Sequence, residues 1–256
     1  MGALMQGPKA KPVKQPAILG FIMYEGPSVL DPTRNIVSVM TFKTSNDKTG
    51  NMAQLWILDA GDLNPLELSK ARLDASICGN CVHRHSNGGA CYVNLAHAPL
   101  AIYKAYKRGR YTHFDATKHA HWITTRKVRL GAYGDPSAMP FAIVNSIVKL
   151  AISHTGYVHQ LAHPNFDMRF IDICMVSSDT PKQALKAQAL GAHTFRVALA
   201  GDTLAEGEVE CLADSKGLSC FDCGLCDGTK GNVAITVHGS RAKRFNSKMI
   251  NLTEVA

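Results

Sequence analysis

The chain has 256 residues, of which 46% are hydrophobic and 19% are charged. This composition supplies enough apolar material for a large core and too little charge for a disordered chain. It predicts one α/β domain over residues 17–256, preceded by a disordered basic tail over residues 1–16. No run reaches the roughly eighteen apolar residues of a membrane span, and the first residues lack the apolar segment of a signal peptide. We therefore expect a soluble intracellular protein without a membrane partner.

Basic residues exceed acidic residues by 28 to 20, which gives a formal net charge of +8. Such an excess is typical of proteins with anionic partners. The basic residues are scattered in short groups, however, as expected of a solvated surface. Residues 103–111 interleave tyrosine with lysine and arginine, a pattern that can stack on bases and neutralise phosphates. We favour an amphipathic helix whose tyrosines pack inward, so nucleic acid is an alternative partner rather than the favoured one.

In chain order, strand patterns alternate with helix patterns. The predicted strands cover residues 36–42, 54–58, 128–133, 157–160, 170–176, 193–199 and 232–238. The predicted helices cover residues 99–108, 141–152 and 181–190, and residues 62–98 form a loop-rich stretch. The third helix has Thr180 as its N-cap, Pro181 at its first position and Gly191 beyond its end.

The alternation of strands and helices between residues 127 and 200 indicates βαβ units and a parallel sheet. The predicted fold class is therefore α/β, with a partial or complete TIM-like barrel that carries two cysteine-rich metal-binding loops. An open, doubly wound sheet is the alternative.

Polar side chains recur at or near the ends of the predicted strands. Ligands of parallel α/β folds bind at the carboxyl ends of strands, so we expect these side chains to share a cleft. The set comprises Asp135, His159, Gln160, Ser178, Asp179, Arg196 and His238. Asp135, His159 and Arg196 are the candidate catalytic residues, although each residue taken alone fits a capping or solvent-facing role.

The eight cysteines are the most informative residues of the chain. Seven fall into two tight sets: the first cysteine group is Cys78, Cys81 and Cys91, and the second cysteine group is Cys211, Cys220, Cys223 and Cys226. Cys174 lies in an apolar segment, where a cysteine is most often a small buried hydrophobe. Without a secretory signal we do not expect disulfides, and C-x-x-C spacing in an intracellular protein indicates metal or redox chemistry.

The second cysteine group has the spacing Cys211-x8-Cys220-x2-Cys223-x2-Cys226. Two successive x2 spacings place three thiols on one short loop, as in bacterial ferredoxins, and Cys211 can supply the fourth ligand of a cubane cluster. A structural zinc site more often pairs two separated C-x2-C knuckles. We therefore predict a 4Fe-4S cluster at this group, with zinc as the alternative.

The first cysteine group has the spacing Cys78-x2-Cys81-x9-Cys91 and needs a fourth ligand. The residues that we consider for this position are His83, His85, His97 and the distant Cys174. A histidine would complete a Cys3His set, which is common for zinc. Three cysteines can also hold an iron–sulfur cluster whose open iron binds a substrate. Iron–sulfur is only slightly favoured over zinc here.

Several phrases of the sequence resemble a widespread family of uncharacterised, cysteine-rich bacteriophage proteins. They include ICGNC at residues 77–81, RLGAYGDPSAMPF at residues 129–141 and CFDCGLCDG at residues 220–228. The resemblance extends from about residue 48 to residue 239. It implies a phage product in the cytoplasm of an infected bacterium, with the cysteine motifs as its hallmark, and it supplies no mechanism.

These observations lead to an iron–sulfur protein that acts in electron transfer or as a redox enzyme. Its partner would be a redox protein or a small-molecule substrate. The second cysteine group would be structural or electron-carrying, and the first would lie nearer the substrate. The alternative from another functional class is a zinc-stapled nucleic-acid-binding protein.

Overall fold

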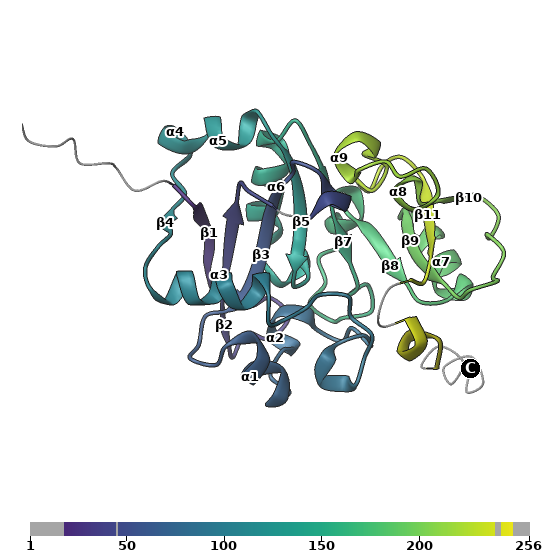
Figure 1. Ribbon diagram of the computed structural model, residues 1–256, viewed down its shortest axis with the longest axis horizontal. Helices are drawn as coiled ribbons and strands as arrows, with labels where there is room; N and C mark the ends of the chain where they lie inside the picture. Colours follow the sequence, from purple (N-terminus) through teal and green to yellow (C-terminus); the bar gives the residue numbers. More distant parts are fainter. Residues whose placement is uncertain (1–17, 45, 239–241, 248–256) are drawn as a thin grey trace, which may run out of the picture.

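The computed structural model describes residues 18–44, 46–238 and 242–247, so the tail predicted over residues 1–16 lies outside the described residues. Two hydrogen-bonded sheets lie side by side in Figure 1. The first sheet, in the order β4-β1-β2-β3-β5-β6, contains β1 (Gly20–Pro27), β2 (Asn35–Thr41), β3 (Ala53–Asp59), β4 (Thr112–His113), β5 (Lys127–Tyr133) and β6 (Ser153–Thr155). The second, in the order β10-β11-β9-β8-β7, contains β7 (Tyr157–Val158), β8 (Met175–Ser178), β9 (Thr194–Ala198), β10 (Glu208–Glu210) and β11 (Asn232–Thr236).

Parallel pairing dominates both sheets. Strand β2 is antiparallel to its neighbours β1 and β3, whereas all other pairs of described strands are parallel. The predicted α/β class with a mostly parallel sheet is therefore confirmed. Among the described strands, however, no pairing joins β10 to β4, so these strands do not close into a complete barrel.

Gly156 joins the two sheets, because it links β6 directly to β7. Strand β6 pairs with β5 on the first sheet, and β7 pairs with β8 on the second. The Gly156 N–H donates to the carbonyl of Cys226 at 3.0 Å, and its carbonyl accepts from the Met175 N–H at 2.9 Å. A Cβ at this position would lie 2.8 Å from the Cys174 sulfur. Glycine is therefore required where the strand passes from one sheet to the other.

The helices are short and lie between or beside the strands. They are α1 (Pro65–Lys70), α2 (Ala75–Cys78), α3 (Ala98–Lys107), α4 (Ala116–His119), α5 (His121–Thr124), α6 (Phe141–Leu150), α7 (Pro181–Gln188), α8 (Leu212–Ser215) and α9 (Cys220–Cys223), with 3-10 turns η1 (Asp47–Thr49), η2 (His85–Asn87), η3 (Pro136–Ala138) and η4 (Met168–Asp172). The predicted N-cap of α7 is confirmed, since Thr180 Oγ1 accepts from the Gln183 N–H at 3.2 Å. Among the described helices, none has the length and apolarity needed to cross a bilayer.

The main core lies between the first sheet and the helices that cover it. Val37, Leu55, Leu130 and Val144 are all fully buried in it. Val37 and Leu55 lie on strands that are buried on both faces, whereas Leu130 alternates with half-buried positions of β5 and Val144 falls on the buried side of α6. Cys174 is also fully buried, as predicted for a small apolar side chain.

Two parts of the sheets differ from the sequence prediction. Strand β1 was not predicted, although it pairs with β2 along its whole length. The strand predicted over residues 170–176 begins only at Met175. The preceding residues form η4 because Asp167 Oδ1 caps the Arg169 N–H at 3.1 Å and the carbonyl of Phe170 accepts from the Cys174 N–H at 2.9 Å. A local cap therefore overrides the β-branched pattern of this segment.

The tyrosine-rich basic run lies on α3 and the turn after it. Tyr103 is buried, and its hydroxyl donates to the carbonyl of Gly61 at 2.8 Å. Tyr106 donates to Glu25 Oε1 at 2.6 Å, and Tyr111 is buried. The inward-packing alternative is thus confirmed, and these rings are turned away from the position that base stacking requires.

Candidate functional site

A cavity of about 470 Å³ extends along the parallel strands, from Arg129 near the start of β5 to Asp179 just beyond the end of β8. All seven residues of the two cysteine groups line it, although the groups are far apart in the sequence. The cavity is also lined by five of the seven polar residues that were predicted to share a cleft: Asp135, His159, Ser178, Asp179 and His238. Gln160 and Arg196 do not belong to the lining. The structure thus brings these five side chains together around one cavity.

The loop that carries the first cysteine group is attached to the end of β7 by one side chain. Gln160 Oε1 accepts from the Asn80 N–H at 2.8 Å, and Gln160 Nε2 donates to the carbonyl of Cys78 at 2.8 Å. The turn at Gly79 has φ of 50°, a region that favours glycine. The Cys81 N–H donates to the carbonyl of Cys78 at 3.2 Å, which places both sulfurs on one tight turn. Gln160 therefore acts as a support for the loop of the first cysteine group rather than as a wall of the cavity.

The second half of this loop returns to the cavity at Cys91. The Cys91 N–H donates to the carbonyl of His83 at 2.9 Å, and this hydrogen bond closes the loop between the two residues. On the cavity side, the Cys81 sulfur lies 3.5 Å from Nδ1 of His159. This contact connects the first cysteine group to the end of β7 and therefore to a histidine predicted from the sequence.

The second cysteine group is held by strands β11 and β6–β7. The Cys211 N–H donates to the carbonyl of Ala234 at 2.8 Å, and the carbonyl of Cys226 accepts from Gly156. Between them, α9 begins at Cys220 because Ser219 Oγ caps the Asp222 N–H at 3.2 Å. The helix ends after one turn at Cys223. The short helix thus presents two cysteines at its two ends.

None of the described cysteines forms a disulfide, and the thiols in the cavity are partly or fully withdrawn from water. Burial raises the pKa of the Cys78 thiol well above its usual range, and its two neighbours in the first group act in the same direction. Burial also raises the pKa of Cys226 to about 12, with its second-group neighbours adding to the effect. Buried thiols this close together ionise readily only when a cation is bound to them. The donor set therefore fits a soft, thiolate-binding metal group.

The spacing of the sulfurs bears on which metal group fits. In the described part of the chain, no three cysteine sulfurs all lie within 4.8 Å of one another. Four thiolates around one tetrahedral zinc, at about 2.3 Å from the ion, would stand only about 3.8 Å apart. The sulfurs are thus spread more widely than one zinc ion requires.

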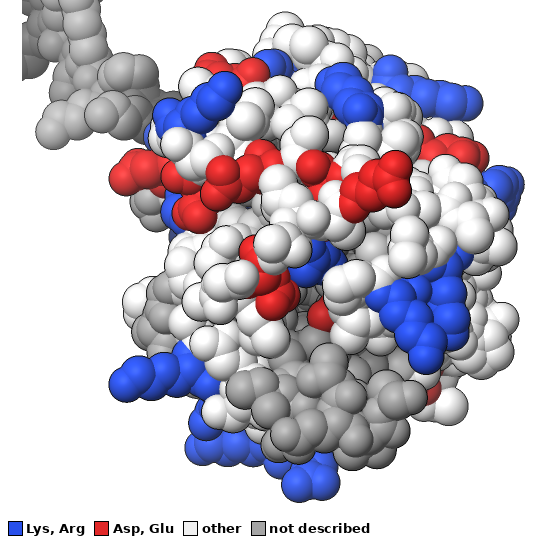
Figure 2. Space-filling view, turned by 90° about the vertical axis from the view of Figure 1, so that its right-hand side faces the viewer, with Lys and Arg blue, Asp and Glu red and all other residues white. Residues whose placement is uncertain are grey.

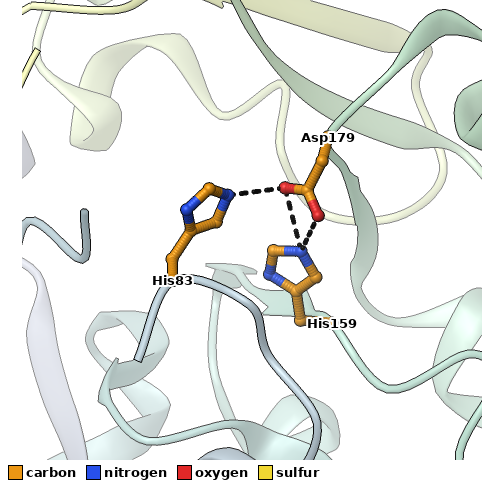
Figure 3. A group of neighbouring side chains, drawn as sticks. All are labelled: His83, His159 and Asp179. Atoms are coloured by element: carbon orange, nitrogen blue, oxygen red, sulfur yellow. Dashed lines mark hydrogen bonds and ion pairs between the residues drawn. The ribbon is translucent and has the colours of Figure 1, made fainter. Parts of the chain in front are cut away.

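His83, His159 and Asp179 form a compact polar cluster beside the first cysteine group (Figure 3). His83 Nε2 lies 2.8 Å from Asp179 Oδ1, and His159 Nε2 lies 3.1 Å from Oδ2 and 3.2 Å from Oδ1. Both rings point at the same carboxylate from two different chain segments. Burial alone would raise the pKa of Asp179, but the two imidazoles outweigh it and hold that pKa below its usual range. Similarly, burial would lower the pKa of His159, yet Cys81 and Asp179 raise it well above the usual value.

Asp135 lines the cavity, but both of its carboxylate oxygens accept hydrogen bonds from the protein. Oδ1 accepts from the N–H and the hydroxyl of Ser137 at 2.9 and 2.7 Å, and Oδ2 accepts from the backbone N–H of His159 at 2.7 Å. Burial raises the pKa of this carboxyl group, although these hydrogen bonds oppose the shift. Asp135 is therefore a positioning residue, which fixes His159 relative to the end of β5.

Arg196 lies on the other side of β9 from the cavity. Its guanidinium donates to Glu208 at 2.7 and 2.6 Å in a pair that is almost fully buried. Its strand neighbours Phe195 and Val197 line the cavity, so the alternation of a strand turns Arg196 away. The structure thus removes Arg196 from the candidate catalytic residues and gives it a structural role between β9 and β10.

Arg129 is a cavity residue that the sequence prediction missed. It lines the cavity with Gly131 and Tyr133, at every second position of β5. In the described part of the chain its buried Nε has no hydrogen-bond partner. Burial raises the pKa of the Cys220 thiol, and the charge of Arg129 opposes this shift. The alternating pattern of residues 128–133 was the signal that could have placed Arg129 on the cavity face.

Charges of both signs occur on the face of the molecule shown in Figure 2. Acidic side chains form a band across its upper half, and basic side chains lie above, beside and below that band. Among the described residues of this face, the basic side chains form no continuous tract of the kind that follows a nucleic-acid backbone.

Comparison with known proteins yields no relative: no family model, curated protein or solved structure matches the chain. The resemblance to bacteriophage proteins stays a prediction. The function is therefore inferred from the cavity and its cysteines alone.

Proposed function

We propose that the chain is an iron–sulfur protein and that it acts as a redox enzyme on a small molecule bound in the cavity. The observation that carries the proposal is that seven thiols from two distant segments line one cavity at the carboxyl edge of a parallel sheet. The second cysteine group provides the four ligands of a 4Fe-4S cluster. The first provides three ligands and leaves one iron open toward the cavity.

The spacing of the cysteine sulfurs supports an iron–sulfur cluster over a single zinc ion. The sulfurs are too widely spaced for three of them to bind one ion in the described geometry. A cubane spreads its ligands over four metal corners and accepts a wider spacing. When bound, such clusters supply one-electron oxidation and reduction.

The residues around the clusters have separate roles in this proposal. Phe195 and Val197 form an apolar wall that limits the access of water. Arg129 presents a positive charge near the second cysteine group and favours the thiolate form of Cys220. His159 can donate or accept a proton at Nε2, next to the buried carboxylate of Asp179. A cavity of about 470 Å³ is within the range of small-molecule sites.

The proposal also includes two more detailed predictions, one about the arrangement of the strands and one about the cellular compartment. The parallel strands from β3 through β10 would represent an incomplete TIM-like barrel, with the site at its carboxyl face. Cysteines that form no disulfides suit a reducing compartment such as the cytoplasm of an infected bacterium. Both points rest on the pattern of strands and thiols, not on a relative.

Anaerobic purification with iron and sulfide supplied tests the proposal. We expect a brown protein with absorbance near ~400 nm and equal amounts of iron and acid-labile sulfide. Replacing Cys220 and Cys223 together by serine should remove the second cluster while leaving iron at the first group. A colourless protein with stoichiometric zinc would overturn the proposal and favour the zinc alternative.

The zinc-stapled nucleic-acid-binding protein is less well supported. Its main evidence is the net charge of +8. The tyrosines that would stack on bases are turned inward, and the charges in Figure 2 are mixed.

A further inference from the structure

We propose that His83, His159 and Asp179 bind a single divalent transition-metal ion, separate from the clusters, with open coordination positions facing the cavity. These residues belong to three chain segments that meet only in the folded protein. They are the one set of described His, Cys, Asp and Glu residues whose donor atoms all lie within 4.8 Å of one another. Two imidazoles and one carboxylate are a ligand set of mononuclear iron and zinc sites that keep positions free for a substrate or water.

The distances between the donor atoms fit this assignment. Two neighbouring ligands at about 2.1 Å from an octahedral ion stand about 3 Å apart. The two imidazole nitrogens lie 2.8 and 3.1 Å from the carboxylate oxygens of Asp179. Because all three donor atoms also lie within 4.8 Å of one another, they can face one ion.

The charges around Asp179 also favour a cation. Its side chain is only 8% exposed, and in the described residues its ion pairs are those with the two histidines. An ionised carboxylate in such a place requires a positive partner. A divalent ion supplies that charge and uses both imidazoles, once each has no proton on Nε2, as ligands.

The surrounding residues resemble the outer shell of a metal site. With Nε2 on the metal, the Nδ1–H of His159 can donate to the Cys81 sulfur at 3.5 Å. The backbone of His159 is held by Asp135, and the Asp179 N–H donates to Gln183 Oε1 at 2.8 Å. Such contacts fix the orientation of metal ligands. The Cys81–His159 contact would also connect the ion to the first cysteine group.

The proposal does not require the clusters, and its test keeps the two questions separate. The anaerobically purified protein is stripped of loosely held metal with a chelator, desalted and titrated with cobalt(II) chloride. Bound cobalt, iron and acid-labile sulfide are then counted per chain. We expect one cobalt per chain, without the thiolate-to-cobalt charge-transfer band that binding at cysteine would produce.

Three variants complete the test. Asp179→Asn keeps the shape of the side chain, and His83→Gln removes a different ligand. Each should weaken cobalt binding at least about tenfold while leaving sulfide and the absorbance near ~400 nm unchanged. His121→Gln, at an exposed histidine on α5, should bind cobalt like the unmodified protein. Circular dichroism establishes that each variant is folded.

Three outcomes would overturn the inference: no cobalt bound by the unmodified protein, unchanged cobalt binding in both ligand variants, or joint loss of cobalt and sulfide, which would make these residues cluster ligands. If the protein lacks iron and sulfide but binds one cobalt that both variants lose, the mononuclear site stands and the cluster proposal fails.

Discussion

The side chain of Gln160 fills the space beside Gly79 that the Cβ of any other residue would need. Its amide holds the backbone on both sides of that glycine, at Cys78 and at Asn80. The turn of the first cysteine group and the end of β7 thus fit together only with glycine at position 79. This relationship makes the shape of the first cysteine group sensitive to a single methyl group.

Gly79→Ala should therefore lower the free energy of unfolding and reduce metal at the first cysteine group. The left-handed backbone alone costs an alanine about 1–2 kcal/mol, and the collision with Gln160 adds to this cost. Gly88→Ala is the matched control, because Gly88 has φ of 64° but has no atom within 4 Å of a built Cβ. Urea unfolding and iron analysis compare the two variants. Equal destabilisation with unchanged iron would show that Gln160 does not constrain the turn.

Cys226→Ala should remove roughly half of the bound iron, because one of two clusters loses a ligand. Cys174→Ala is the control: this cysteine is fully buried outside the cavity lining. It should keep all of its metal and lose only about 1 kcal/mol through the small cavity created. Iron and sulfide per chain, measured on anaerobic samples, check both expectations. Loss of iron from the Cys174 variant would place that residue among the ligands.

The buried pair of Arg196 and Glu208 should stabilise the fold without influencing the metal. Glu208→Gln leaves the buried guanidinium with only the more exposed carboxylate of Asp202, at 3.6 Å, and should cost about 3–5 kcal/mol. Glu210→Gln, at an exposed position of the same strand, should cost less than about 0.5 kcal/mol. Denaturant unfolding at neutral pH measures both values. A change in the iron content of the folded Glu208 variant would indicate that Arg196 influences the site.

The same pair also gives a pH dependence with a definite sign. Burial would raise the pKa of Glu208, but the hydrogen bonds from Arg196 outweigh it and lower that pKa in the folded state. A depressed carboxyl pKa stabilises the fold above the unfolded value of about 4.3, and this contribution is lost as the pH falls through the folded value. Unfolding free energies between pH 6 and pH 3 should therefore fall more steeply for the unmodified protein than for Glu208→Gln. Identical slopes would contradict this assignment.

The basic residues of α3 should have little effect on the cavity. Replacing Lys104, Lys107 and Arg108 by alanine should leave iron, sulfide and cluster absorbance unchanged. Single-stranded DNA and RNA should bind the unmodified protein weakly at physiological salt, since the tyrosines of this helix face inward. Micromolar or tighter binding that falls steeply with salt and disappears in the triple variant would favour the nucleic-acid alternative.

The sequence predicted local structure well where contacts within a single strand or helix determine that structure. The strand over residues 54–58 follows from a short run of apolar residues, and the start of α7 at Pro181 follows from a cap; both signals involve only near neighbours. The segment over residues 170–176 was wrong because the carboxylate of Asp167 stabilises a turn that the apolar pattern does not reveal.

The site was predictable in its residues but not in its geometry. Spacing identified both cysteine groups, and the strand-end rule placed Asp135 and His159 at one edge. Nothing in the spacing of either group indicates that both line one cavity, because their meeting depends on β6 and β7 continuing through Gly156. The contact of His83 with Asp179 is likewise long-range. Arg196 lies between two residues that line the cavity, and because neighbouring side chains of a strand point to opposite faces, it points away from the cavity.

The separation of the two cysteine groups along the chain also determines the order in which the parts of the cavity form during synthesis. About 120 residues separate Cys91 from Cys211, and contacts between such distant segments form late in folding. The first group therefore leaves the ribosome long before the rest of the cavity exists. During that interval its thiols are exposed to oxidation. Safe maturation requires either a strongly reducing surrounding or a metal donor that reaches the chain before translation ends.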